Sequence, residues 1–121
     1  MASIYTSDFY ELSAYPQYAL LKVFENVFLE EDKVLDIQSK LKEIFSNKPF
    51  VLISDRQFKY DIDLSVYKLQ LPNMKGMAVV SADDYHRERA IMEQPLFNNS
   101  FAFFSKMEDA VAWASTFLVH K

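Results

Sequence analysis

The sequence predicts a mixed α/β domain whose central sheet is mostly parallel. Three observations support this fold class. Short apolar runs typical of buried strands occur at residues 50–53, 77–80 and 101–104. Segments with the three- and four-residue apolar spacing of helices precede and follow these runs. Strands that alternate with helices indicate parallel pairing with right-handed crossovers, so we expect about five strands and about four helices.

The first part of the chain predicts an N-terminal β-hairpin followed by a helix. Residues 9–12 and 18–24 are rich in aromatic and aliphatic side chains, and Pro16 suits a turn between them. The acidic run 30–32 favours a helix start because carboxylates complement the N-terminal helix dipole. Apolar side chains then recur at helical spacing, at Val34, Ile37, Leu41, Ile44 and Phe45.

The middle of the chain predicts the central strand and a short helix. Residues 50–53 are all apolar, as in a strand that is covered on both faces. Residues 54–60 are polar and aromatic, which is typical of a loop. Leu64, Tyr67 and Leu71 then indicate a short helix, and Pro72 ends it.

Two strand–helix units are expected to complete the domain. A strand at 77–80 precedes a helix that runs to about Glu93, with Ser81 as its expected cap and Asp83 and Asp84 in its first turn.

The last unit is a strand at 101–104 and a final helix. Ser105 and Glu108 have the spacing of a capping box at the start of this helix. With no repeat, linker or low-complexity segment in the sequence, we expect residues 1–121 to form a single domain.

Composition argues against several functions. The formal net charge is −4, and acidic residues are interleaved with basic ones, so the basic stripe needed to bind nucleic acid is missing. The absence of Cys excludes disulfides and thiolate chemistry, and a single glycine, Gly76, argues against glycine-rich phosphate loops. Carboxylates at the helix starts further disfavour phosphate binding. No secretory signal or membrane span is visible, so we expect a cytoplasmic protein.

The sequence offers no pair of side chains suited to catalysis. Its only histidines are His86 and His120, the second one residue from the end of the sequence. His86 lies in a charged helical segment, where a solvent-exposed side chain is expected. Neither histidine has an evident nucleophile beside it, and two histidines without Cys make a poor metal site. We therefore expect no enzyme activity, no catalytic or metal-binding residues and no cofactor.

Any binding site is expected where the parallel strands end. Loops and helix starts converge at the carboxyl ends of the strands in open α/β sheets. The residues expected on this rim, as contacts for a partner or ligand, are Asp55, Arg56, Ser81, Asp83 and His86. Arg56 is expected either to form a salt bridge with Asp83 or Asp55 or to contact a partner. In the second case Arg56→Ala weakens partner binding and changes stability by less than about 1 kcal/mol, as expected for an exposed ion pair.

The order of elements, the stretch 50–56 and the closing stretch 103–113 resemble the SpoIIAA-like family. The resemblance covers nearly the whole chain. It implies the STAS-like fold of anti-sigma-factor antagonists, a fold related in shape to Sec14-type lipid carriers. In the antagonists a phosphorylated serine follows the central strand, in a turn with a serine pair and a glycine. The corresponding stretch 54–58 has neither, so Ser54 is expected to be bonded to the backbone at the strand end.

Two functional hypotheses remain open. The first is a non-enzymatic interaction or regulatory domain that binds a protein partner or a second copy of itself as a homodimer. The second is a carrier of a small apolar, lipid-like ligand. Aromatic residues make up 16% of the chain, which favours both a covered apolar surface and an apolar ligand site.

Overall fold

The computed structural model describes residues 3–118. Its strands are β1 (Ser3–Thr6), β2 (Tyr10–Ala14), β3 (Tyr18–Val23), β4 (Phe28–Leu29), β5 (Phe50–Asp55), β6 (Asp61–Ile62), β7 (Met74–Val80) and β8 (Ser100–Phe104). Its α-helices are α1 (Glu31–Phe45), α2 (Asp84–Glu93) and α3 (Met107–Phe117), and its 3₁₀ helices are η1 (Leu64–Lys68) and η2 (Gln94–Leu96).

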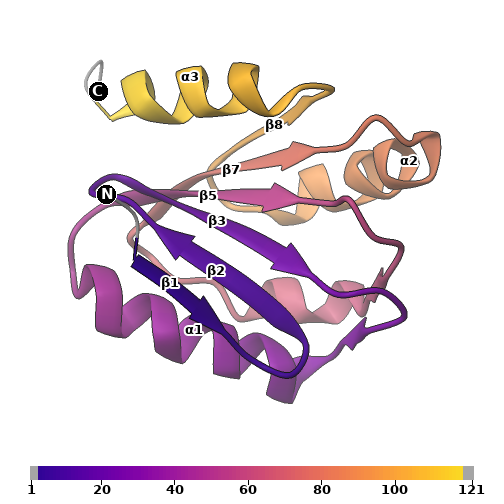
Figure 1. Cartoon of the computed structure of the whole chain (residues 1–121), viewed down its shortest axis with the longest axis horizontal. Coiled ribbons are helices and arrows are strands. Elements are labelled where there is room, and N and C mark those ends of the chain that lie inside the picture. Colours follow the sequence, from indigo (N-terminus) through magenta and orange to yellow (C-terminus); the bar gives the residue numbers. More distant parts are fainter. Residues whose placement is uncertain (1–2, 119–121) are drawn as a thin grey trace.

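Six strands form the central sheet in the order β1-β2-β3-β5-β7-β8 (Figure 1). The pairs β1·β2 and β2·β3 are antiparallel, whereas β3·β5, β5·β7 and β7·β8 are parallel. The short strands β4 and β6 form a separate parallel pair. The mixed, mostly parallel sheet confirms the expected fold class. The described residues contain three α-helices rather than about four, and six strands in the main sheet rather than about five.

The N-terminal hairpin forms as expected, and β1 adds an outer strand to it. Tyr15 N donates to Tyr18 O at 2.9 Å across the turn, and the two rings stack with centroids 4.7 Å apart. β1 was not expected because its sequence, Ser-Ile-Tyr-Thr, has no alternation of apolar and polar residues, and all four residues are exposed in the structure. Its place is set by antiparallel pairing with β2.

The long amphipathic helix and the central strand are both confirmed. α1 buries Ile37, Leu41 and Phe45 against the sheet, and Phe45 stacks on Phe50 with ring centroids 4.3 Å apart. β5 lies between β3 and β7, and its first five residues are buried. An apolar strand in this position contributes to the core on both faces of the sheet.

The helix predicted from Leu64 to Leu71 is shorter and tighter than expected. Asp63 accepts a hydrogen bond from Ser65 N at 3.0 Å, and the segment then forms the 3₁₀ helix η1. It ends at Lys68, before Pro72. Runs of 3₁₀ helix are usually short, and this segment therefore does not form a fourth α-helix.

Both predicted caps at the later helices are wrong in detail. Asp83 caps α2, since its carboxylate accepts from Tyr85 N at 2.9 Å, while Ser81 accepts from Asp83 N at 3.0 Å in the preceding turn. α3 begins one residue later than a capping box at Ser105 requires, and its N-cap Lys106 makes no side-chain cap bond. Propensity placed both helices correctly, but local hydrogen bonding decided where each one begins.

The sheet is covered on both faces and has two apolar cores. α3 packs on one face, over a cluster that includes Val51, Ile53 and Ala78. α1 lies beneath the opposite face in Figure 1, over a larger cluster that includes Tyr10, Leu41 and other buried residues. Both cores therefore share β5 as their common wall.

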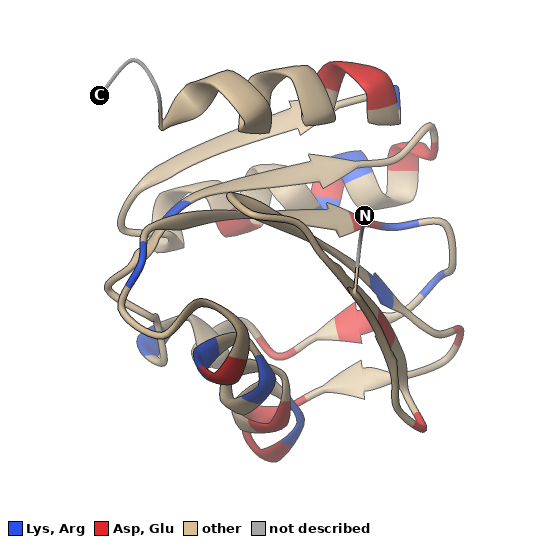
Figure 2. Ribbon diagram, turned by 60° about the vertical axis from the view of Figure 1, so that its left-hand side comes forward, with Lys and Arg blue, Asp and Glu red and all other residues tan. Residues whose placement is uncertain are grey.

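Charges of both signs are interspersed on the surface. Figure 2 shows Lys and Arg next to Asp and Glu along α1, whereas β8 carries no charged residue. None of the helices within residues 3–118 has the length and apolar character needed to cross a bilayer.

Candidate functional site

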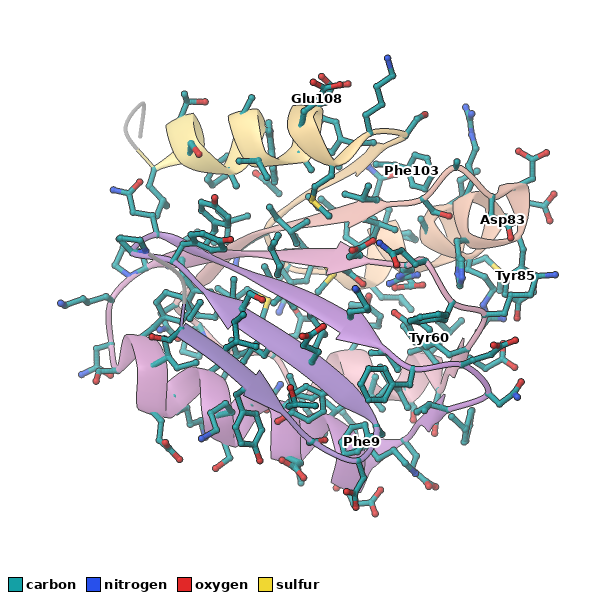
Figure 3. All side chains as sticks on the ribbon, viewed as in Figure 1. Phe9, Tyr60, Asp83, Tyr85, Phe103 and Glu108 are labelled. Atoms are coloured by element: carbon teal, nitrogen blue, oxygen red, sulfur yellow. The ribbon has the colours of Figure 1, made fainter. Side chains whose placement is uncertain are left out.

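The rim predicted at the carboxyl ends of the strands forms a real depression. Asp55, Arg56, Ser81 and Asp83 all line a surface basin of about 570 Å³, together with residues after β5, β7 and β8. Figure 3 places Asp83 at the start of α2, at the end of the sheet where β5 and β7 terminate. The structure thus brings four of the five predicted rim residues to one basin, and His86 does not line it.

Most polar atoms of the basin already have local partners. Ser81 is buried and accepts from Asp83 N, while Asp83 is engaged as the cap of α2. Asp55 is half-buried, and burial raises the pKa of its carboxyl, with Lys22 opposing the change. Two side chains of the basin, Ser81 and Asp83, therefore hold the turn before α2 and the start of the helix.

The sequence suggested that Arg56 pairs with Asp83 or Asp55 at the surface, but the structure shows a different partner. Its guanidinium donates two hydrogen bonds of 2.6 Å to the carboxylate of Glu93. The Arg56 side chain is 3% exposed and that of Glu93 is 0% exposed. The expectation of an exposed ion pair is therefore wrong, because the chain turns the Arg56 side chain into the interior, toward the end of α2.

The inward-facing stripe of α2 explains this pairing. His86, Ala90 and Glu93 are the buried residues of the helix, spaced by four and three positions. This spacing places all three on one face. Glu93 was not predicted as buried because it and His86 are polar, and polar residues are not expected on the inward face of a helix. Their helical spacing from Ala90 places them on the same face as this small apolar residue, and this spacing could have indicated that they are buried.

A short hydrogen-bond network surrounds the buried ion pair. Tyr67 donates to Glu93 at 2.5 Å, and Arg56 Nε donates to Ser54 Oγ at 3.1 Å. Ser54 Oγ and Tyr60 Oη lie 3.3 Å apart and share one further hydrogen bond. Ser54 is therefore bonded to side chains, and not to the backbone as expected. Every charged group of this network has an interior partner.

The network keeps its members in fixed charge states. Burial alone would lower the pKa of Arg56, but the negative charges of Tyr60 at high pH and of Glu93 outweigh it, and the pKa lies above its ordinary value. Burial, followed by the charge of Glu93, raises the pKa of Tyr67. At neutral pH the guanidinium is charged, and Tyr67 is a neutral donor.

His86 is buried, which overturns the expectation of a solvent-exposed histidine. Its side chain is 2% exposed, and Nε2 lies 2.8 Å from the carbonyl oxygen of Phe58. The rings of Tyr60 and Tyr85 lie against it, with centroids 5.7 Å and 5.2 Å away. Burial is the main cause that lowers the pKa of His86, and Arg56 adds to it. His86 therefore fixes the loop after β5 to α2 as a neutral side chain.

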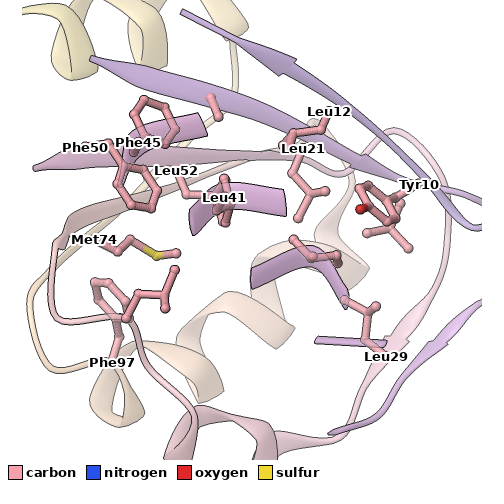
Figure 4. Close-up of a cluster of buried hydrophobic side chains, with 14 of the residues drawn as sticks. Tyr10, Leu12, Leu21, Leu29, Leu41, Phe45, Phe50, Leu52, Met74 and Phe97 are labelled. Carbon is pink, nitrogen blue, oxygen red and sulfur yellow. The ribbon is translucent and has the colours of Figure 1, made fainter. Parts of the chain in front are cut away.

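An apolar cavity lies between α1, η1 and the sheet. It has a volume of about 100 Å³, and its walls include Leu21 and Leu52 from the sheet, Ile37 and Leu41 from α1, and Phe97. Figure 4 shows Leu21, Leu41 and Leu52 converging in this region. Apolar periodicity predicts these residues only as core, because it indicates which side chains face inward and not whether they fill the interior.

One end of the cavity is polar. Ser54, Arg56, Tyr60 and Tyr67, the network around Glu93, all line it. Gln38 lines it from α1, and its amide donates to Leu69 O. The cavity thus combines apolar walls with a few converging polar groups, the arrangement typical of small-molecule sites.

Metal chemistry finds no support in the part of the chain that is described. Between residues 3 and 118, no three side chains of the His, Asp and Glu types gather closely enough to hold a metal ion. His120 lies outside the described residues.

Comparison with known proteins identifies the fold. No family model matches the sequence, and no curated protein matches it. A solved structure is similar, that of an uncharacterised DUF3478-family protein from Shewanella loihica PV-4 with a SpoIIAA-like fold. The two share 17% sequence identity and a TM-score of 0.61, over 94% of this chain and 92% of that chain. The fold is SpoIIAA-like. The fold expected from residues 50–56 and 103–113 is therefore confirmed, and at this identity the similarity concerns the fold alone.

Proposed function

We propose that this SpoIIAA-like domain is a non-enzymatic binding module whose ligand is a small apolar molecule or the end of an apolar chain. The observation that carries the proposal is the apolar cavity of about 100 Å³ beneath α1. A core cavity of about 150 Å³ in another protein stays dry and binds benzene or xenon. The present cavity is smaller, at about 100 Å³, so it suits a ligand of about the size of benzene or slightly smaller.

The packing around the cavity supports a role for it. Protein interiors are normally packed to crystal-like density, whereas this partly open space of about 100 Å³ has mostly apolar walls. A ligand that fills the space gains dispersion contacts with these walls.

A pair of variants on α1 tests the proposal. Val34 is half-buried and lines the cavity, whereas its neighbour Leu35 is 44% exposed and does not line it. Val34→Phe directs a larger side chain into the cavity, and Leu35→Phe is the matched control. Benzene binding is followed through amide chemical shifts. We expect saturable binding by the natural protein and by Leu35→Phe, and at least tenfold weaker binding by Val34→Phe.

Two results would count against this function. One is the lack of saturable shifts in the natural protein, and the other is equal binding by Val34→Phe and Leu35→Phe. Native mass spectrometry of freshly purified protein gives an independent measurement, because a co-purified ligand appears as a mass adduct.

A second candidate function is self-association through β8. This strand ends the sheet, and within residues 3–118 no other strand pairs with its outer edge. It has no charged residue or Pro, the usual devices that protect an exposed edge. Antiparallel pairing about Ala102 would place Phe101 of one copy opposite Phe103 of the other, which gives two cross-strand aromatic pairs. These features support a homodimer built by edge pairing.

Light scattering at about 100 μM tests this candidate, because that concentration exceeds a typical weak-dimer dissociation constant. We expect a dimer mass for the natural protein and a monomer mass for Phe103→Lys, which places a charge on the edge. Ile4→Lys is the control on the opposite edge strand, where Ile4 is 65% exposed. A monomer mass for the natural protein excludes the edge dimer. A dimer that survives Phe103→Lys and not Ile4→Lys moves the interface to β1.

A further inference from the structure

The polar end of the cavity defines what kind of ligand head it can receive. This inference rests on the proposed binding function and deepens it. The groups at this end are Arg56, Ser54, Tyr60 and Tyr67, with Glu93 behind them. Two properties of the cluster matter for recognition, its net charge and the number of hydrogen-bond donors it leaves over.

The net charge of the cluster is zero. The Arg56 guanidinium and the Glu93 carboxylate neutralise one another through two bonds of 2.6 Å. Tyr67 adds a neutral donor to the same carboxylate. A ligand carboxylate placed here would lose its hydration without gaining an unpaired cation, and it would lie near Glu93. Both effects oppose an anionic head. An ammonium head faces the same difficulty with the guanidinium.

The hydroxyl pair leaves one donor over. Ser54 and Tyr60 have two hydroxyl hydrogens between them, and one of these joins their oxygens across 3.3 Å. Ser54 Oγ also accepts a hydrogen bond from Arg56 Nε, and this bond uses neither of the two hydroxyl hydrogens. Whichever hydroxyl donates to the other, one O–H remains. Ser54 is 4% exposed and Tyr60 is 5% exposed, and both line the cavity.

We propose that the cavity selects a small apolar ligand that carries one neutral hydrogen-bond acceptor, such as a ketone, ester or ether oxygen. The acceptor takes the remaining hydroxyl hydrogen of the Ser54–Tyr60 pair, and the apolar part of the ligand lies against Leu21, Leu41 and Leu52. A buried O–H without an acceptor is unfavourable, so this head group completes the network. Neutrality follows from the Arg56–Glu93 pair.

Three molecules of nearly the same shape test the inference on the natural protein. They are 2-pentanone, butyrate and 2-methyl-1-pentene, which present a neutral carbonyl, an anionic carboxylate and no acceptor. Binding is measured by amide chemical shifts at pH 7. We expect 2-pentanone to bind at least tenfold more tightly than butyrate, and 2-methyl-1-pentene to bind measurably.

The outcomes separate this inference from the function on which it rests. If none of the three molecules binds, the binding function itself fails. If butyrate binds as tightly as 2-pentanone, the cavity is a binding site but the neutral-head assignment is wrong. If only 2-methyl-1-pentene binds, the site takes apolar molecules and the acceptor assignment is wrong.

Variants of the hydroxyl pair locate the donor. Tyr60→Phe leaves the Ser54 hydroxyl free to donate, and Ser54→Ala leaves that of Tyr60, so each single variant retains one available O–H. Only the double variant removes both. We expect both single variants to keep the ratio of 2-pentanone to 2-methyl-1-pentene affinity within about threefold, and the double variant to lower it about tenfold. Because Ser54→Ala also removes the acceptor of Arg56 Nε, the double variant is compared with Ser54→Ala, in which this N–H is freed as well. An unchanged ratio between these two folded variants overturns the assignment of the donor.

Discussion

The buried pair Arg56–Glu93 is expected to be the most sensitive polar contact in the molecule. Its two side chains are 3% and 0% exposed and joined by two bonds of 2.6 Å. Removal of one partner leaves the other charge unpaired in the interior, which typically costs 3–5 kcal/mol, whereas removal of both costs much less. Since small domains are stable by about 5–15 kcal/mol, one substitution removes a large share of the total.

A double-mutant cycle measures this coupling. The variants are Arg56→Met, Glu93→Gln and the two together, and urea unfolding at pH 7 is followed by circular dichroism. We expect each single variant to lose about 3–5 kcal/mol and the double variant to lose at least about 2 kcal/mol less than the sum.

The exposed pair Lys33–Glu30 provides the control. Its atoms lie 3.0 Å apart, but its side chains are 30% and 48% exposed, so the corresponding variants are expected to lose less than about 1 kcal/mol. The reasoning is refuted if either change at Arg56 or Glu93 costs less than about 1 kcal/mol, or if their effects simply add.

Two further predictions concern the fold around the site. Gly76→Ala is expected to destabilise the protein by about 1–3 kcal/mol in urea unfolding, because a Cβ at this position meets the Trp113 ring at 3.1 Å. Unchanged stability would contradict this, since it would mean that the Trp113 side chain moves aside without cost. Stability of the natural protein is expected to fall as the pH drops below about 6.5, because unfolded His86 binds a proton that the folded, pKa-lowered side chain does not. His86→Gln removes this part of the slope, while the opposite effect of Asp55, whose pKa is raised, is retained. Identical pH slopes in the two proteins would contradict the assignment.

The sequence predicted the parts of the fold that depend on apolar periodicity. The long helix α1 and the central strand β5 were expected because their apolar residues alone determine which faces are covered. β1 was missed because its stability comes from pairing with β2 and not from its own pattern. The short helix at Leu64 was overextended, since a pattern of three apolar residues does not distinguish an α-helix from a 3₁₀ turn.

The site divides in the same way. Topology alone brought Asp55, Ser81 and Asp83 to one basin, because parallel strands end at the same edge. The direction of a side chain beyond the strand end is not encoded in such a pattern, so the inward turn of Arg56 to Glu93 was not predicted. The cavity could not be predicted either, because it depends on how side chains from α1, from η1 and from the five strands β3, β4, β5, β6 and β7 pack together.

A crystal of the protein pressurised with xenon tests the central claim most directly, because xenon binds apolar cavities through dispersion and reports their volume and position. The proposed function predicts one strong xenon peak in contact with Leu21, Leu41 and Leu52, beneath α1. A cavity that holds no xenon, because side chains have closed it or ordered water fills it, would contradict the claim that this domain keeps an apolar binding site.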